Sequence, residues 1–483
     1  MKQTIKNALL HTLSLIISLS GAFSAPAYAT YATNIVSENV SLTQEMTAEE
    51  VENIARSLTA EAVLDDDVFA GVSAPAPKSD EEIIPFSKEE ILVDKGARIA
   101  DDFAIPKGLE KRVSFWFDVY TKYSDKTHVI HHVLYPWIVF KIVDTTPIYS
   151  SNLHKWTKYH NAKKFVSKEI ANVRLTLRKL AKRKSYKNLK GLEKEIFSAL
   201  AEVKGSRRKV LREAANNMRV QLGQRDFFLS GLTSSAKYLP YMEQEFKAVG
   251  LPTELARLPF VESSFNEKAH SKVGASGIWQ IMPVTGRAYF RVNDNIDERN
   301  SPLKASLAAA DIFRTNYKQL KDWPLAVTAY NHGVGGLKSN LRKGRATNLP
   351  DLIAKYHAGS FKFASANFYT CFLAVVHAER YHQEIFSKEE IVRDAPMVHH
   401  VFALKSPIRV NKVIQMTGLD KESFLTYNMD LKNAAKKNIK LPAGFKVLLP
   451  PVAKRNLETN LGPSLMKEAE NMSLNRPGKK RRG

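Results

Sequence analysis

Apolar residues recur every three or four positions through much of the chain, and this spacing predicts a mainly α-helical protein. The helical pattern is strongest from Tyr238 to about Phe386. It also occurs in an earlier and very basic segment, where the repeating apolar positions are Val173, Leu177, Leu180, Leu192, Ile196 and Leu200. We therefore expect two helical regions in succession.

The pattern changes towards the end of the chain, where short strand-like and helical segments alternate. Residues 398–404 and 445–449 have the character of strands, and residues 407–417 and 421–427 have helical spacing. We expect a small α+β module over residues 397–452, in the order strand, helix, helix, strand.

The chain begins with the pattern of a secretory signal peptide. Lys2 and Lys6 precede an apolar run from residue 8 to residue 23, and Ala27-Tyr28-Ala29 follows as a small-x-small site. We expect residues 1–29 to be removed and the mature protein to be periplasmic or secreted. The alternative is an N-terminal membrane anchor, but the run is shorter than the ~20 residues that a spanning helix needs. No cysteine lies near the cleavage site for a lipid anchor, and no other segment is apolar enough to span a membrane.

Charge divides the rest of the chain, whose formal net charge is +23. Residues 30–102 are expected to be a largely disordered acidic leader, since residues 31–102 hold 17 acidic and 5 basic side chains. Residues 103–235 are expected to be a basic helical region, in which residues 154–219 hold 20 Lys or Arg and 5 Asp or Glu. Residues 453–483 form a basic tail. Nucleic acid, an anionic membrane or the anionic cell envelope would each suit such a surface. A solvated helix face without a partner is the alternative.

The single cysteine, Cys371, cannot form an intramolecular disulfide. It lies in an apolar run from Phe368 to Val376, so we interpret it as a small core residue and not as a nucleophile. The pair His131-His132 lacks partners at metal-ligand spacing. We therefore expect no metal and no cofactor.

One carboxyl group stands out by its surroundings. A helix is predicted to begin near Pro252, which suits a first turn, and to end at Glu262. Phe260, Val261 and Phe265 surround Glu262 with apolar groups. Because desolvation disfavours the charged form, this carboxyl can stay protonated near neutral pH and act as a general acid. Taken alone, the pattern also fits a surface glutamate at a helix end.

Two later segments strengthen this interpretation. Small residues precede Trp279 and Gln280 and permit tight turns and close approach of an extended ligand. Trp279 offers an apolar platform, and Gln280 offers an amide that suits sugar hydroxyl and acetamido groups. Further on, Tyr330 and Asn331 end an apolar helix before a glycine-rich turn.

These motifs resemble those of the family 1 lytic transglycosylases, which share the goose-type lysozyme fold. Glu262-Ser263 matches the first family motif, Gly277-Ile278-Trp279-Gln280 matches the second, and Ala329-Tyr330-Asn331-His332-Gly333 matches the third. The membrane-bound lytic transglycosylase D type is the most similar. The resemblance implies a lysozyme-like helical catalytic domain over residues 236–390.

The sequence departs from the family at one position. The family usually carries a late tyrosine that faces the catalytic glutamate. Phe368 stands at the matching position here, and Tyr369 follows it. One residue turns a helix by about 100°, so Tyr369 replaces the family tyrosine only if the local turn is rearranged.

The resemblance implies cleavage of the β-1,4 bond between N-acetylmuramic acid and N-acetylglucosamine in peptidoglycan glycan strands. Glu262 would donate a proton to the bridging oxygen and then take one from the muramoyl C6 hydroxyl, which closes a 1,6-anhydro ring. The residues expected to bind or orient the substrate are Ser263, Trp279, Gln280, Tyr330, Asn331 and Tyr369.

The C-terminal module resembles LysM modules, which bind N-acetylglucosamine polymers, in its order of elements and in Leu441-Pro442-Ala443-Gly444. It lacks the Gly-Asp-Thr opening of many such modules. A packing appendage to the catalytic domain is the alternative.

Three other functions stay open. A muramidase of the same fold would add water, held by Asp294, Asp297 or Glu298. A non-catalytic peptidoglycan-binding protein would not need Glu262. A nucleic-acid-binding protein would suit the basic charge, but the signal peptide and the lack of a nucleic-acid-binding motif argue against it. We expect residues 154–219 to bind anionic envelope polymers instead.

Overall fold

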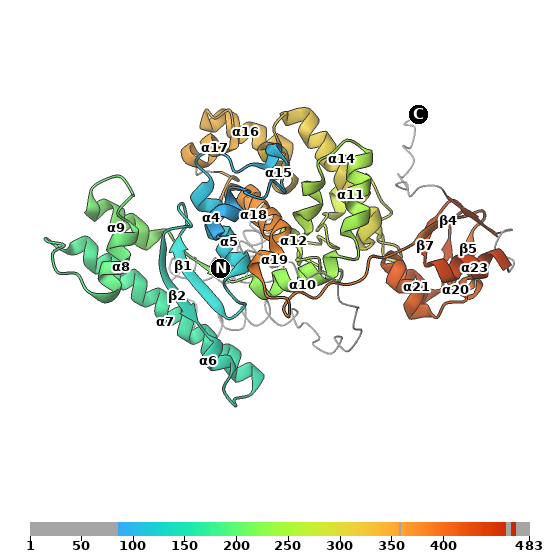
Figure 1. Ribbon diagram of the computed structural model, residues 1–483, viewed down its shortest axis with the longest axis horizontal. Coiled ribbons are helices and arrows are strands. Elements are labelled where there is room, and N and C mark those ends of the chain that lie inside the picture. The colour runs from blue at the N-terminus through green and yellow to red at the C-terminus, as the bar shows by residue number, and fades with distance from the viewer. Residues whose placement is uncertain (1–85, 357–358, 460–464, 470–483) are drawn as a thin grey trace, which may run out of the picture.

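The computed structural model describes residues 86–356, 359–459 and 465–469 of the chain (Figure 1). This part is mainly helical with small antiparallel sheets, as the sequence predicted. The signal peptide, most of the acidic leader and the end of the basic tail lie outside the described residues. None of the helices in the described part has the length and apolar character needed to cross a membrane.

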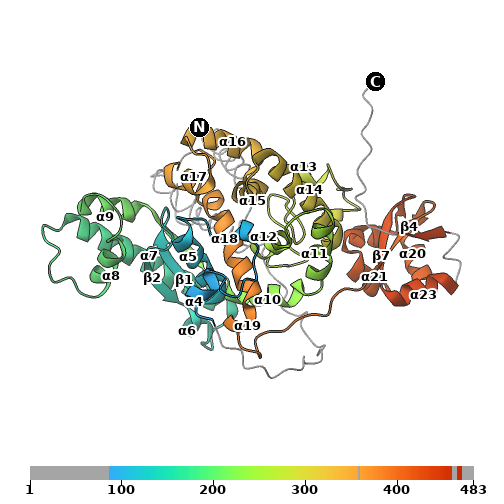
Figure 2. The same cartoon turned by 45° about the horizontal axis from the view of Figure 1, so that its top comes forward.

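A long and almost fully buried helix, α18 (Phe363–Arg380), runs through the centre of the fold (Figure 2). Apolar side chains occur on all of its sides, which is the pattern of a helix that must be covered all round. Helix α5 (Glu110–Thr121) packs along one side, and α12 (Leu258–Glu262) and α15 (Trp323–His332) pack on others. The predicted catalytic motifs and a segment from far upstream therefore share one helix as their support.

Further helices complete the central unit around α18. Their bounds are α10 (Arg225–Ser235), α11 (Leu239–Ala248), η2 (Thr253–Arg257), α13 (Pro283–Gly286), η3 (Glu298–Asn300), α14 (Pro302–Leu320), α16 (Val334–Gly344), α17 (Leu349–Lys355) and α19 (His382–Ile385).

The region expected to be purely helical also contains a three-stranded antiparallel sheet. Its strands are β1 (Thr127–His132), β2 (Val139–Asp144) and β3 (Met218–Leu222), in the order β2-β1-β3. The basic helices pack on this sheet around a small core of their own: α6 (Thr146–Tyr149), α7 (Lys155–Lys182), α8 (Gly191–Ala199) and α9 (Arg207–Asn216). The sheet was not predicted, because its strands are short and β3 pairs with β1 across a long insertion.

Residues 86–102, which were assigned to the disordered leader, are folded onto the central unit. They include α4 (Lys88–Leu92), and η1 (Asp101–Phe103) follows. The Gly96 amide donates to the Tyr381 hydroxyl at 2.8 Å, and the Ala100 amide donates to Glu254 Oε1 at 3.1 Å. The Asp94 carboxylate also accepts from the Tyr381 hydroxyl at 2.5 Å, so an acidic composition alone does not indicate disorder here.

The C-terminal module has the predicted order of strand, helix, helix and strand, formed by β4 (His400–Leu404), α20 (Val410–Thr417), α21 (Lys421–Tyr427) and β7 (Lys446–Leu449). Shorter elements lie between them: β5 (Ile408–Arg409), η4 (Met429–Leu431), α22 (Lys432–Lys437) and β6 (Lys440–Leu441).

Part of the predicted basic tail belongs to this module. Helix α23 (Pro451–Thr459) buries Ala453 and Leu457, and β8 (Met466–Glu468) pairs with β4 to give the sheet order β7-β4-β8. These apolar positions are widely spaced among Lys and Arg, so composition alone assigned them to a tail.

A buried ion cluster fixes the module to the central unit. Lys304 Nζ of α14 lies 2.6 Å from Asp430 Oδ2 of the module and 3.2 Å from Glu298 Oε1. All three side chains are at most 5% exposed. The Lys304 ammonium also lies 4.4 Å from the centre of the Phe445 ring, and Ile296 of the central unit packs into the core of the module. Two carboxylates can be buried here because one ammonium lies between them.

We predict that Lys304→Met lowers the free energy of unfolding by about 3–5 kcal/mol, because it leaves two carboxylates buried without their cation. Chemical denaturation of the full chain measures this. Lys437→Met is the matched control, since Lys437 is exposed and contacts Asn295 at the edge of the same interface. Equal stabilities of the two variants would contradict the prediction.

Candidate active site

Glu262 is the last residue of α12, and the chain leaves the helix immediately after it. The expected single helix from Pro252 is instead the 3₁₀ segment η2 followed by the short helix α12. Ser264 and Phe265 then adopt φ values of 51° and 54°, in the left-handed region. This sharp exit ends the helix beneath neighbouring elements, so that Glu262 is 2% exposed. The alternative of an ordinary surface glutamate is therefore wrong.

Burial raises the pKa of Glu262 to about 8. Desolvation is its whole cause, with no charge or hydrogen bond from the described residues to offset it. The carboxyl is thus protonated at neutral pH, as the apolar surroundings predicted. A protonated carboxyl of this kind can act as a general acid.

Ser263 joins the glutamate segment to the second motif. Its hydroxyl donates to the Ile278 carbonyl at 2.8 Å, so Ser263 supports the position of Glu262 through the backbone. Gln280 has a φ of 45° and donates its side-chain amide to the carbonyls of Gly277 and Ala269, at 2.8 and 3.1 Å. The half-buried Gln280 therefore holds its own turn with its amide nitrogen and keeps its side-chain oxygen for other contacts.

The second motif lies against a loop that requires glycine. A Cβ built on Gly277 would lie 2.1 Å from the Arg299 carbonyl oxygen, and Gly277 has a φ of 74°. Arg299 in turn donates to the carbonyls of Gly274 and Ile281, at 2.7 and 2.8 Å, and pairs with Asp297. Position 277 therefore requires glycine, because the backbone at Arg299 leaves no room for a Cβ atom.

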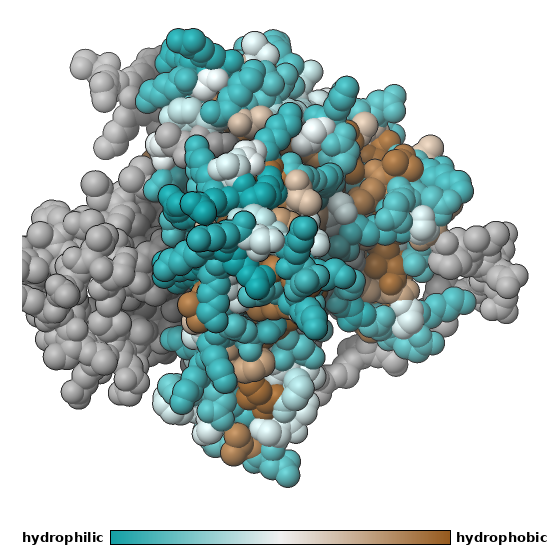
Figure 3. Space-filling model, turned by 90° about the vertical axis from the view of Figure 1, so that its left-hand side faces the viewer, coloured by the Kyte–Doolittle hydropathy of each residue, from teal (hydrophilic) through white to brown (hydrophobic). Residues whose placement is uncertain are grey.

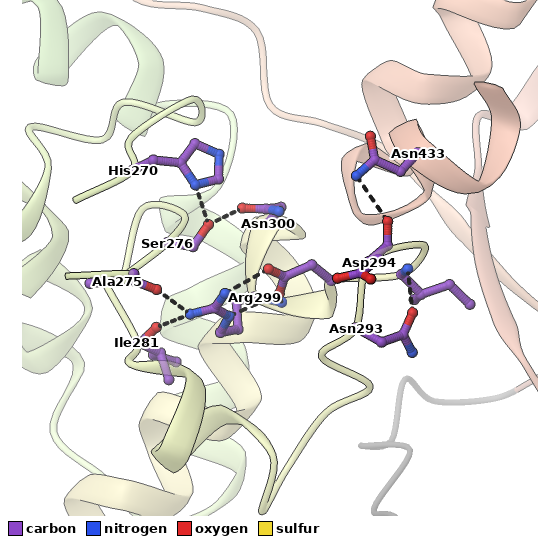
Figure 4. Close-up of polar contacts among 12 residues, drawn as sticks. His270, Ala275, Ser276, Ile281, Asn293, Asp294, Arg299, Asn300 and Asn433 are labelled. Atoms are coloured by element: carbon purple, nitrogen blue, oxygen red, sulfur yellow. Dashed lines mark hydrogen bonds and ion pairs between the residues drawn. The ribbon is translucent and has the colours of Figure 1, made fainter. Parts of the chain in front are cut away.

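Figure 4 shows the polar contacts of this loop. The Ser276 hydroxyl lies between His270 and Asn300, and Asn433 of the C-terminal module donates to the Asp294 carbonyl at 3.1 Å. The loop beside the second motif is therefore held from both the central unit and the module.

Tyr330 and Asn331 lie near the end of α15, as the sequence predicted. The Tyr330 hydroxyl donates to the Trp279 carbonyl at 2.9 Å, which ties the third motif to the second. Burial first, and then the charge of Glu262, raise the pKa of Tyr330. Asn331 Oδ1 accepts a hydrogen bond from the Ser365 hydroxyl at 3.4 Å, and that hydroxyl also contacts His332 Nδ1. The three motifs are therefore assembled around Glu262.

Trp279 does not form the expected platform for a sugar. It is fully buried, and its indole Nε1 donates to the Ser306 hydroxyl at 2.9 Å. Its ring stacks on Phe246 with 5.9 Å between centroids. Ile278 and Ile281 are buried as well, so the apolar side chains of this turn face the core and Gln280 is its half-buried member. Trp279 contributes to the site by packing and through its carbonyl.

Tyr369 does not take the place of the family tyrosine. It is 1% exposed, and no described residue hydrogen-bonds its hydroxyl. Burial raises its pKa, with smaller contributions from Asp322 and Asp102 and none from Glu262. The rotation of 100° along α18 thus points this ring elsewhere, as the helix geometry required.

Another tyrosine, whose pKa is affected by Glu262, lies on α5. The pKa of Tyr120 is raised by burial, by Cys371 and by Glu262. Tyr120 was not among the predicted site residues, because it lies far upstream of the family motifs. Its only signal was an aromatic pair four residues apart, Trp116 and Tyr120, on one helix face.

Cys371 is 3% exposed, which confirms its interpretation as a core residue. Among the residues that the structure describes, no three His, Cys, Asp or Glu side chains are grouped to hold a metal ion. The ring centroids of His131 and Phe115 lie 4.9 Å apart, and burial lowers the pKa of His131 to about 3.

Comparison with known proteins finds a domain family whose model matches the segment that carries the site. Residues 242–351 match the model of the transglycosylase SLT domain. The chain is 30% identical over 219 residues to the membrane-bound lytic murein transglycosylase D of Escherichia coli K12, which covers 43% of this chain and 46% of the relative. The protein of that name from Escherichia coli O6:H1 gives the same values.

A putative tributyltin chloride resistance protein of an Alteromonas species is 37% identical over 101 residues, which covers 20% of this chain and 48% of the relative. The chain thus spans about half the length of the curated relatives it matches. The family resemblance drawn from the motifs is confirmed over the segment that carries them.

We predict that Glu262 makes the protein less stable as the pH rises. The folded state keeps the proton up to a pH of about 8, whereas the unfolded chain releases it near the ordinary value of 4.5. Between these limits the free energy of unfolding falls, by a total on the order of 4–5 kcal/mol.

Denaturant unfolding of wild type and Glu262→Gln at pH 5 and pH 8 checks this, because glutamine does not titrate. The variant should gain stability relative to wild type at the higher pH. Glu422→Gln, an exposed change, is the control. A wild type and a Glu262→Gln variant with the same pH dependence would contradict the prediction.

Proposed function

We propose that this protein is a lytic transglycosylase that cleaves peptidoglycan between N-acetylmuramic acid and N-acetylglucosamine. The observation that carries the proposal is a buried, protonated Glu262 around which the three motifs of the matched domain meet. Export to the periplasm or beyond belongs to the proposal, since peptidoglycan lies outside the cytoplasmic membrane.

The reaction would use Glu262 twice. The protonated carboxyl donates its proton to the glycosidic oxygen, and the C1–O bond breaks. The carboxylate then accepts the proton of the muramoyl C6 hydroxyl, whose oxygen bonds to C1 and closes the 1,6-anhydro ring. A carboxyl whose pKa is about 8 can donate at neutral pH and is a stronger base than an ordinary carboxylate afterwards.

Tyr330, Asn331 and Gln280 would orient the sugars. The Gln280 side-chain oxygen suits a hydroxyl or an acetamido N–H, because its amide nitrogen is already engaged. Asn331 lies on the same end of α15 as Tyr330, whose hydroxyl is held by the Trp279 carbonyl.

A muramidase of the same fold would need a second carboxylate to hold water. Two of the acids considered for that role are engaged elsewhere, Asp297 with Arg299 and Glu298 with Lys304. Asp294 is exposed on the loop beside the C-terminal module. These contacts favour cyclisation over hydrolysis, and the retained acid disfavours a purely binding function.

We predict that wild-type protein releases anhydromuropeptides from purified peptidoglycan and that Glu262→Gln lowers the rate by at least a factor of about 100, because the general acid is lost. Mass spectrometry of the products measures both. Products with reducing ends would contradict the transglycosylase and indicate a muramidase. Binding without products would indicate a non-catalytic role.

The basic helices are proposed to hold anionic polymers of the cell envelope. Figure 3 shows that the face of the molecule over α7–α9 is predominantly hydrophilic, with separate apolar patches. Lys182 and Lys184 at the end of α7 are exposed, whereas Arg183 between them pairs with Glu193 at 2.9 Å. The LysM-like module is proposed as a second contact to the glycan.

We predict that Lys182→Gln with Lys184→Gln lowers binding to isolated sacculi severalfold at low salt, because two phosphate- or carboxylate-binding charges are lost. Co-sedimentation measures the bound fraction. Lys318→Gln with Lys321→Gln, which removes the same charge from exposed positions of the central unit, is the control. Unchanged sedimentation of the first variant would refute the role of α7.

A further inference from the structure

His332 stands at the variable place of the third motif, directly after Asn331, and both nitrogens of its ring are engaged. Nδ1 lies 2.8 Å from the Ser365 hydroxyl, near the start of α18. Nε2 lies 2.7 Å from the side-chain nitrogen of Asn340 on α16. Ser365 and Asn340 are 5% and 3% exposed, so these contacts are made inside the protein. The imidazole thus connects the end of α15 to two other helices.

The partner of Nε2 fixes the direction of the hydrogen bonds in this network. An amide nitrogen can only donate, so Asn340 donates to Nε2, and Nε2 carries no proton. The one proton of the neutral ring is then on Nδ1, which donates to the Ser365 oxygen. The Ser365 hydroxyl in turn donates to Asn331 Oδ1 at 3.4 Å. Burial lowers the pKa of His332, which favours the neutral ring that this direction requires.

A second serine contacts the other end of the ring. The hydroxyl of the exposed Ser360 lies 3.3 Å from His332 Nε2 and 3.4 Å from Asn340 Nδ2. Ser365 lies at the Nδ1 end, and its hydroxyl is the one that continues to Asn331. Removal of either hydroxyl takes one contact from the same imidazole, so the two serines form a matched pair.

The bond from Ser365 sets which way the Asn331 amide is turned. An asparagine side chain carries an acceptor oxygen at one end and an NH₂ donor at the other, and turning it over exchanges the two. Because the oxygen accepts from a residue of α18, the NH₂ group is placed at the opposite end of the amide. A sugar group that meets this end must offer an acceptor, such as the carbonyl oxygen of an acetamido group.

We propose that His332 is a positioning residue for Asn331, which acts through Ser365 and directs the NH₂ end of the Asn331 amide to an acceptor oxygen of the glycan. The glycan contact rests on the proposed function, whereas the direction of the network does not. The variable place of the third motif then takes part in substrate recognition in this chain.

Nitrogen-15 NMR of histidine-labelled protein measures the direction of the network. The shifts of the two ring nitrogens distinguish a proton on Nδ1 from a proton on Nε2, and His332→Asn identifies the signal. We expect a neutral His332 ring with its proton on Nδ1. A proton on Nε2 would overturn the proposal, because the Ser365 hydroxyl would then donate to the ring and not to Asn331.

Glycan affinity tests the link to Asn331. The probe is a soluble oligomer of N-acetylglucosamine, titrated by calorimetry into full-length protein that carries Glu262→Gln. Ser365→Ala should weaken binding about tenfold, because a hydrogen bond to the sugar loses its fixed orientation. Ser360→Ala is the control and should change the affinity by no more than about twofold. Equal losses in the two variants would count against the proposal, and so would a parent chain that does not bind the oligomer.

Two replacements of His332 separate positioning from packing. The amide nitrogen of asparagine can take the place of Nδ1, and that of glutamine can take the place of Nε2. His332→Asn should therefore keep the bond to Ser365 and most of the affinity, whereas His332→Gln should lose about as much as Ser365→Ala. The same loss in both replacements would indicate a merely structural role. This pair also decides the matter if Ser365→Ala does not fold.

A double variant shows whether the effect passes through Asn331. In a chain that already carries Asn331→Ala, Ser365→Ala should weaken binding no further, whereas additive losses would refute the positioning role. Cleavage of peptidoglycan by the wild type is measured separately. The expected pattern of affinities without anhydromuropeptide products would overturn the proposed function and support the positioning role. Products together with additive losses would do the reverse.

Discussion

The burial of α18 on all of its faces is the constraint on which the rest of the structure depends. A helix without a solvated side needs partners all round it, and α12 and α15 of the matched segment do not cover every side of α18. Helix α5 covers the side on which Asn367 and Cys371 lie, and α12 and α15 bring Glu262 and Tyr330 to the others. The same packing that covers α18 removes water from the Glu262 carboxyl. Fold and acidity therefore have a common cause.

Sequence reasoning succeeded where local chemistry is decisive. The apolar neighbours of Glu262 predicted its burial, and the glycine before Ile278 marked a backbone approach that a Cβ would block. The boundaries of α21 were predicted to the residue. In each case the information lies within a few residues of the feature.

It failed where distant segments meet. Trp279 has the composition of a sugar platform but faces Phe246 and Ser306, which lie in two other helices. Tyr120 is separated from Glu262 in sequence by the basic helices α7–α9, and β3 pairs with β1 across the same helices. The segment 86–102 makes its contacts with residues more than 150 positions away, through backbone amides and through side chains such as Arg98, and no local pattern reveals such partners.

The packing of residues 86–102 over the end of the central unit also bears on when the fold can be completed. The Gly96 amide and the Tyr381 hydroxyl belong to residues 285 positions apart in the chain. The neighbouring partners Arg98 and Glu384 are 286 positions apart. Contacts of such long range form late in folding, because a large loop must close first. Residues 86–102 can therefore reach these partners only after the chain has been synthesised through Glu384. A chain that ends before these partners therefore lacks the finished core of the fold.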